Sequence, residues 1–98
     1  RQPARRKMNS ADAGRRFTVM SREWCHLCHD LIAALEPIAA EAGWQIEVID
    51  VDLHPDLEER WGEWVPVLLH GDHEICHYHL DEGAVRAYCS GFPLESPA

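Results

Sequence analysis

The sequence predicts one α/β domain, with a four-stranded mixed sheet and three helices in the order β-α-β-α-β-β-α. Three observations support this prediction. Short apolar runs alternate with segments of helical periodicity, a tight turn separates the last two runs, and 98 residues suffice for one core. No apolar run approaches the roughly 18 residues that a membrane-spanning helix requires.

The first half is expected to form a strand, a long helix and a second strand. Residues 17–21 are apolar and partly β-branched, as in a buried strand. Apolar residues then recur at spacings of three and four over residues 25–42, and Gly43 is expected to end this helix. Pro37 should kink the helix rather than end it. Residues 44–51 form the second strand, parallel to the first because a helix connects the two.

The second half is expected to form a short helix, a hairpin and a last helix. Pro55 suits the first position of the short helix, which should end before Gly62. Residues 65–69 and 75–80 are the hairpin strands, and Gly71-Asp72 between them is a typical tight-turn pair. Asp81 should then cap a helix that runs to about residue 89.

Charge divides the chain into a basic arm and an acidic body. Residues 1–16 hold six of the nine Lys and Arg residues and one acid, and we expect a flexible arm or leader there. The domain is expected over 17–91 and a tail over 92–98. Residues 17–98 hold 3 basic and 16 acidic residues, a formal net charge of −13. Such a body repels phosphate backbones, which argues against nucleic-acid binding.

Cys25 and Cys28 stand where the first strand gives way to the long helix. A spacing of three places both residues on one helix face, with Cβ atoms about 5–6 Å apart, so the sulfurs are close enough to join. The free N–H groups and the positive dipole end at a helix start favour the thiolate of Cys25. His26 and Arg22 add positive charge, whereas Glu23 opposes it.

Cys28 is expected one turn deeper, where it should be less exposed and keep its proton. This asymmetry suits an attacking thiolate and a resolving thiol. Two inert buried cysteines, or half of a metal site, are the alternatives. Redox chemistry is favoured because the pair follows a strand and opens a long helix inside a β-α-β unit.

Val65-Pro66 is the second signal for function. Pro66 opens a strand that should be central, where proline removes a hydrogen bond of the sheet. A cis bond at a bend resolves this conflict, because X–Pro bonds adopt cis at low cost. An ordinary trans proline at a strand start is the alternative, and from the residues alone it is the commoner case.

Three features resemble the thioredoxin superfamily: Trp24-Cys25-x-x-Cys28, Pro37 inside the helix, and Val65-Pro66 before the hairpin. Ser21-Arg22-x-x-Cys25-x-x-Cys28 and the short element order resemble glutaredoxins and glutaredoxin-like proteins over about residues 17–90. The resemblance implies that Cys25 attacks, that Cys28 resolves and that Pro66 follows a cis bond. It also implies that the backbone of Val65 binds an extended substrate.

The resemblance further implies substrate-binding roles around the cysteines. Arg22 matches the position of the family's cationic residue, and Trp24 and His26 flank Cys25. His26-Leu27 replaces the usual Pro-Tyr between the cysteines. His79-Leu80-Asp81-Glu82 replaces the usual Gly-Gly-x-Asp-like stretch that holds glutathione, so only Asp81 carries over.

The sequence therefore predicts a thiol–disulfide oxidoreductase that acts on protein or low-molecular-weight disulfides. The alternative is a thioredoxin-fold binding module that holds a metal, an iron–sulfur cluster or a partner protein without turnover. We expect a cytoplasmic monomer with no metal and no bound cofactor, no membrane or nucleic-acid partner, and glutathione as a candidate reductant. Cys76 and Cys89 are expected to be small apolar packing residues.

Overall fold

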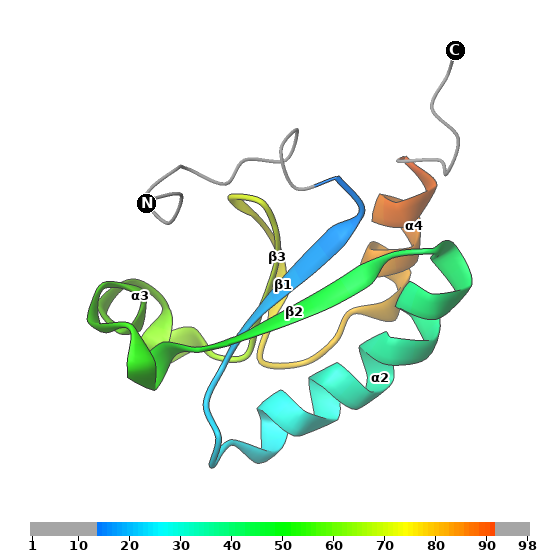
Figure 1. The fold of residues 1–98 in the computed structure, drawn as a ribbon. Helices are drawn as coiled ribbons and strands as arrows, with labels where there is room; N and C mark the ends of the chain where they lie inside the picture. The colour runs from blue at the N-terminus through cyan, green and yellow to red at the C-terminus, as the bar shows by residue number, and fades with distance from the viewer. Residues whose placement is uncertain (1–13, 92–98) are drawn as a thin grey trace.

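The computed structural model describes residues 14–91, and there it confirms the predicted α/β order (Figure 1). Its strands and helices are β1 (Arg16–Ser21), α2 (His26–Ala42), β2 (Gln45–Asp50), α3 (Pro55–Trp61), β3 (Val67–His70), β4 (His73–His77) and α4 (Glu82–Ser90). Two 3₁₀ turns flank α3, namely η2 (Val51–Leu53) and η3 (Gly62–Trp64). No helix within residues 14–91 is both long and apolar enough to cross a membrane.

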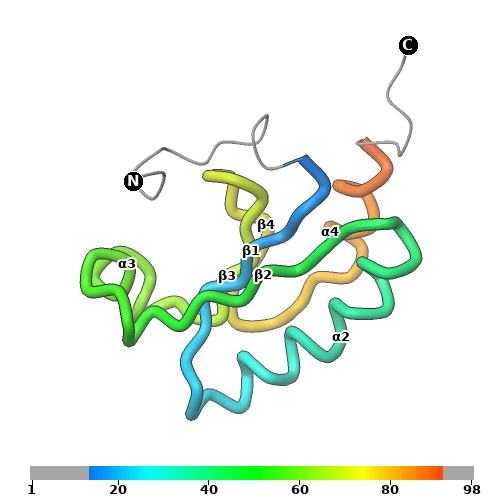
Figure 2. The backbone as a smooth tube through the Cα atoms, in the orientation of Figure 1, coloured from blue at the N-terminus to red at the C-terminus, as the bar shows by residue number. Residues whose placement is uncertain are grey.

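The four strands form one mixed sheet in the order β2-β1-β3-β4. β1 and β2 are parallel, whereas β3 is antiparallel to both β1 and β4. The tube in Figure 2 shows the β3–β4 hairpin beside β1. β3 is therefore a central strand, as predicted, and its first residues follow directly after Pro66.

The two faces of the sheet are covered by different helices. α2 and α4 pack on one face, around Phe17, Val19 and Leu68. The other face carries Met20, Val67 and Leu69, against which η2 and α3 pack. Adjacent positions on β1 thus serve opposite faces, as the strand period of two requires. The end of β1 therefore lies between two packed layers, one formed by α2 and α4 and the other by η2 and α3.

α2 is positioned by its caps and its buried stripe. Its buried residues recur at spacings of three and four: Cys28, Leu31, Leu35, Ile38 and Ala39. Gly43 ends the helix in the left-handed conformation (φ 78°), and its N–H faces the carbonyls of Ala39 and Ala40. Pro37 lies inside the helix without ending it.

Several predicted boundaries move by a few residues. The predicted arm ended at residue 16, but Arg16 belongs to β1 and the carbonyl of Arg15 accepts the N–H of Gln45 at 2.9 Å. These charged residues belong to the sheet because their backbone pairs with the start of β2. Residues 1–13 of the expected arm and the expected tail 92–98 lie outside the described residues.

The second hairpin strand is the largest correction. It was predicted over residues 75–80, but β4 spans His73–His77. The strand starts early because Gly71, with φ 63°, allows a two-residue turn that pairs His70 with His73. It ends early because Tyr78 adopts φ 67°, which is not an extended conformation.

Candidate active site

The cysteine pair lies at the start of α2. Cys25 is the N-cap residue, with extended backbone angles (φ −108°, ψ 109°). Its sulfur accepts the backbone N–H of Cys28 at 3.1 Å. Cys25 is half-buried, whereas Cys28 is fully buried with 0 % of its surface exposed. The structure thus gives the two sulfurs the unequal access that the helix position predicts.

The environment of Cys28 favours the protonated thiol. Burial raises the pKa of the Cys28 thiol, and the hydrogen bond that it donates to Cys25 raises this pKa further. The backbone of Arg22 and the hydroxyl of Ser21 partly offset the shift. Cys28 therefore keeps its proton and rests against the last residue of β1 and the residue after it.

Val65 and Pro66 lie at the same end of the sheet as the cysteines. Met20, one residue before the end of β1, pairs with Val67, so the chain leaves β1 where it enters β3. The Val65–Pro66 peptide bond is cis, Pro66 is buried, and Val65 is half-buried. The carbonyl of Pro66 accepts the backbone N–H of Tyr78 at 2.7 Å. This bond fixes the entry of β3 against the end of β4.

An aromatic group lies beside this proline and consists of Trp64, His77 and Tyr78. The ring centroid of Trp64 is 5.4 Å from that of His77 and 6.1 Å from that of Tyr78. The Tyr78 hydroxyl donates to the carbonyl of Glu63 at 3.0 Å, which ties the residue after β4 to η3. Trp64 and Tyr78 remain 44 % and 37 % exposed. Trp61, by contrast, packs against the core under α3.

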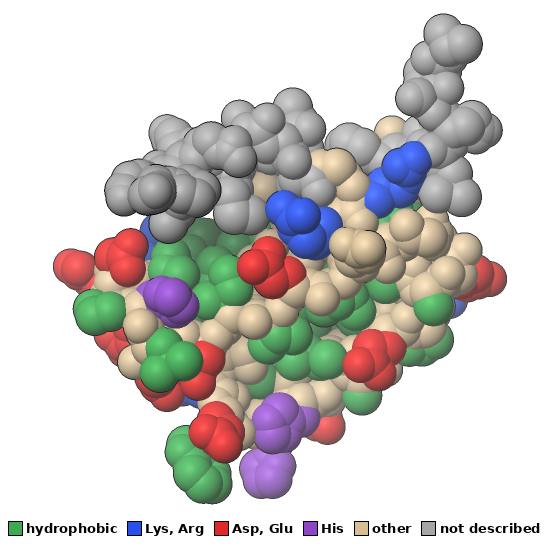
Figure 3. All heavy atoms as spheres, viewed as in Figure 1, with side chains coloured by type: hydrophobic (Ala, Val, Ile, Leu, Met, Phe, Trp, Pro, Cys, Tyr) green, Lys and Arg blue, Asp and Glu red, His purple; other side chains and the backbone are tan. Residues whose placement is uncertain are grey.

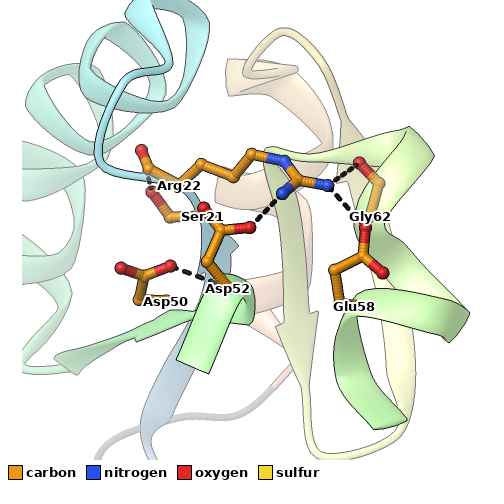
Figure 4. Close-up of polar contacts among 6 residues, drawn as sticks. All are labelled: Ser21, Arg22, Asp50, Asp52, Glu58 and Gly62. Carbon is orange, nitrogen blue, oxygen red and sulfur yellow. Dashed lines mark hydrogen bonds and ion pairs between the residues drawn. The ribbon is translucent and has the colours of Figure 1, made fainter. Parts of the chain in front are cut away.

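Arg22 is held by an ion-pair clamp, which we define as Arg22, Asp52, Glu58 and Gly62 (Figure 4). One guanidinium nitrogen contacts the carboxylate of Asp52. The other donates to Glu58 Oε2 at 3.0 Å and to the carbonyl of Gly62 at 3.1 Å. The clamp joins residues 22–25, the cysteine loop between β1 and α2, to η2, α3 and η3. The positive charge expected to serve Cys25 and a substrate is therefore already engaged by two carboxylates.

Gly62 is part of the clamp because nothing larger fits there without movement. A Cβ atom at this position would lie 2.7 Å from Arg22 Nη2 and 2.7 Å from Glu58 Oε2. The absence of a side chain thus lets the guanidinium reach the backbone carbonyl.

The other predicted site residues are dispersed around the cysteines. Trp24, directly before Cys25, is 87 % exposed. His26 is exposed in the first turn of α2. Asp81 caps α4 by accepting the N–H of Ala84 at 3.0 Å, as predicted, and its backbone contacts the thiol of Cys76.

Within the described residues 14–91, the remaining cysteines and histidines form no metal-binding cluster. Cys76 and Cys89 pack against the main core, and burial raises the pKa of both thiols. His77 bonds to Glu74 at 2.6 Å. No group of three or more His, Cys, Asp or Glu side chains in residues 14–91 is arranged to hold a metal ion.

Sequence reasoning missed the partners of Arg22. Asp52, Glu58 and Gly62 follow it by 30, 36 and 40 residues. Acidic residues at such separations from Arg22 form no periodic pattern with it that would predict an ion pair. The useful clue was compositional, since a lone arginine amid many carboxylates is expected to be paired.

A mixed sheet in this strand order, with a Cys-x-x-Cys pair at a helix start, defines a protein of the thioredoxin-like fold class. A family model described as "Glutaredoxin-like domain (DUF836)" matches residues 16–90, and the chain belongs to this glutaredoxin-like family. The match covers most of the chain, including both cysteines and the Val65–Pro66 segment.

The chain is also similar to solved structures and to curated relatives. The chain is similar to protein Ne2328 of Nitrosomonas europaea, with TM-score 0.67 and 38 % identity over 76 % of this chain and 91 % of that one. It is also similar to protein XcR50 of X. campestris, with TM-score 0.61 and 28 % identity over 79 % of this chain and 99 % of that one. "Uncharacterized protein Rv0508" of Mycobacterium tuberculosis is 27 % identical over 81 % of this chain and 87 % of the relative.

Proposed function

We propose that this protein is a thiol–disulfide oxidoreductase in which Cys25 attacks and Cys28 resolves. The observation that carries the proposal is the unequal pair at the start of α2. Cys25 is half-buried, and its sulfur accepts the backbone N–H of Cys28 at 3.1 Å. The thiol of Cys28 is buried beside it.

The exchange proceeds in two balanced steps. The Cys25 thiolate attacks one sulfur of the substrate disulfide, forming a mixed disulfide and releasing the first substrate thiolate. Cys28 then passes its proton to the released thiolate or to solvent and attacks Cys25 Sγ, which forms the Cys25–Cys28 disulfide and releases the second substrate thiolate. Two electrons pass from the protein dithiol to the substrate.

The substrate is proposed to be a protein or low-molecular-weight disulfide. The half-buried Val65 and the exposed Trp24 and Trp64 support binding of an extended segment beside the cysteines. We further propose that the protein works as a monomer in a reducing compartment such as the cytoplasm, without a bound cofactor, and is recycled by a thiol reductant.

Cysteine variants test this proposal directly. Cys25→Ser is expected to abolish reduction of bis(2-hydroxyethyl) disulfide. Cys28→Ser should instead accumulate a mixed disulfide that mass spectrometry detects, because the resolving thiol is missing. Cys76→Ser and Cys89→Ser are matched controls that should retain activity. Full activity of Cys25→Ser would refute the assignment. Visible absorption of anaerobically purified protein would favour cluster binding instead.

A further inference from the structure

We propose that the ion-pair clamp around Arg22 sets the charge selectivity of the dithiol. It favours disulfides that carry positive charge and disfavours anionic ones such as glutathione disulfide. This inference rests on the proposed function, and it makes Asp52 and Glu58 specificity-determining residues.

Arg22 is the cation nearest to the cysteines along the chain, and the carboxylates of the clamp offset its positive charge. The carbonyl of Arg22 accepts the N–H of Cys25 at 3.4 Å, so its backbone belongs to the cysteine loop. Its side chain extends toward η2 and α3, where it contacts Asp52 of η2 and Glu58 of α3 (Figure 4). Two carboxylates against one guanidinium leave the clamp with a net negative charge.

The segments around the clamp strengthen this field. Residues 22–23 and 50–64 together hold seven acidic and two basic side chains, a formal net charge of −5. In Figure 3 acidic side chains gather around α3. The second of these cations, Arg60, lies 4.7 Å over the ring of Trp61 on the same helix. The net charge of α3 is still negative, because the helix also carries Asp56, Glu58 and Glu59.

The other described cations lie too far away or are engaged elsewhere. Arg15 precedes β1 and Arg16 starts it, and the strand's five further residues to Ser21 span roughly 17 Å. That distance exceeds the Debye length of about 8 Å at physiological ionic strength. Arg86 on α4 pairs with Glu41 and Glu82.

A charged disulfide therefore meets a negative flank as it approaches Cys25. Each unit charge on the substrate interacts with this flank through partly aqueous surroundings, which makes the effect modest and sensitive to salt. A dication such as cystamine gains from this field, and a dianion such as glutathione disulfide loses. Freeing Arg22 from its carboxylates would reduce the difference.

The experiment compares three small disulfides with the reduced protein: cystamine (cationic), bis(2-hydroxyethyl) disulfide (neutral) and glutathione disulfide (anionic). Each rate constant is divided by that of the same disulfide with dithiothreitol, which removes intrinsic reactivity. The normalised rate should fall in the order cationic, neutral, anionic. The spread should collapse as ionic strength rises from about 0.01 M to about 1 M, where the Debye length falls from about 30 Å to about 3 Å.

Variants then assign the effect to the clamp. Asp52→Asn and Glu58→Gln should each lower the normalised cystamine-to-glutathione ratio by at least about threefold at low salt. Glu59→Gln removes the same charge from the same helix outside the clamp and should change the ratio less. Circular dichroism checks that each variant is folded. The salt dependence is measured on the unmodified protein, so it tests the inference even if a variant fails to fold.

The outcomes separate the two proposals. Failure to reduce even the neutral disulfide would refute the proposed function, and this inference with it. Reduction of the neutral disulfide with equal or salt-independent normalised rates would overturn the inference alone. The inference is also overturned if Glu59→Gln shifts the ratio as much as the clamp variants do.

Discussion

The sulfur of Cys25 lies 3.1 Å from the backbone nitrogen of Cys28. The contact is an N-cap hydrogen bond, in which the side chain before the helix accepts an N–H from its first turn. Cys25 thus takes a position usually filled by Ser, Thr, Asp or Asn. Cys28, three residues later, points into the core beneath it. The helix start therefore leaves Cys25 half-buried and places Cys28 in the protein interior.

The first prediction concerns the order of alkylation. Iodoacetamide at neutral pH should label Cys25 before Cys28 in the reduced, folded protein. Cys28 should react only at higher pH or after unfolding, because burial raises the pKa of its thiol and blocks access. Peptide mapping by mass spectrometry over a pH series measures both rates. Preferential labelling of Cys28 would show that the roles are reversed.

The fold was predictable because its signals are local. The spacing of Leu31, Leu35 and Ile38 gives the helix, and Gly71-Asp72 gives the turn. The predicted boundaries were wrong where the backbone conformation of a single residue determines the end of a strand. Tyr78 ends β4 in the left-handed conformation, which tyrosine rarely adopts and which the sequence therefore does not predict.

The site was predictable only in part, for the same reason. Cys25 and Cys28 are close in sequence, and the strand before them fixes their place. Arg22 was also identified, but not the direction of its side chain. That direction depends on Asp52 and Glu58, whose approach requires the complete fold. Contacts that span 30 or more residues are set by topology rather than by local pattern.

The second prediction concerns stability and pH. The pKa values of three thiols, those of Cys28, Cys76 and Cys89, are raised by burial. The folded state thus holds these protons more tightly than the unfolded state does. The resulting stabilisation is complete below the ordinary thiol pKa of about 8.5 and is lost as pH rises through the folded-state values.

Urea unfolding of the reduced protein measures this effect. The free energy of unfolding should fall between about pH 8 and about pH 9.5, the window that follows from the ordinary thiol pKa. Replacing Cys89 by Ala should flatten this slope, since one titrating thiol is removed. An increase in stability across the same window would contradict the prediction.

The third prediction concerns the core under α2. Leu35 has 0 % of its surface exposed and packs between the helix and the sheet. Leu35→Ala should lower the free energy of unfolding by about 2–5 kcal/mol, because it removes buried methyl groups and leaves a cavity. Leu53→Ala is the matched control: Leu53 is 73 % exposed, so its loss should cost less than about 0.5 kcal/mol. Equal losses for the two variants, measured by urea unfolding, would show that the described packing is wrong.

The last prediction tests the clamp through its backbone. A Cβ added at Gly62 would lie 2.7 Å from the ends of the Arg22 and Glu58 side chains. Both ends are flexible, so Gly62→Ala should preserve the fold but displace the guanidinium from the Gly62 carbonyl. The normalised cystamine-to-glutathione ratio should then fall, in the same direction as for Glu58→Gln. Gly83→Ala is the control, because the added Cβ atom would have its nearest neighbour at 3.7 Å, an ordinary van der Waals contact. It should leave the ratio unchanged. If Gly62→Ala also leaves the ratio unchanged while Glu58→Gln lowers it, the carboxylate charge alone sets selectivity and the close approach at Gly62 has no part in it.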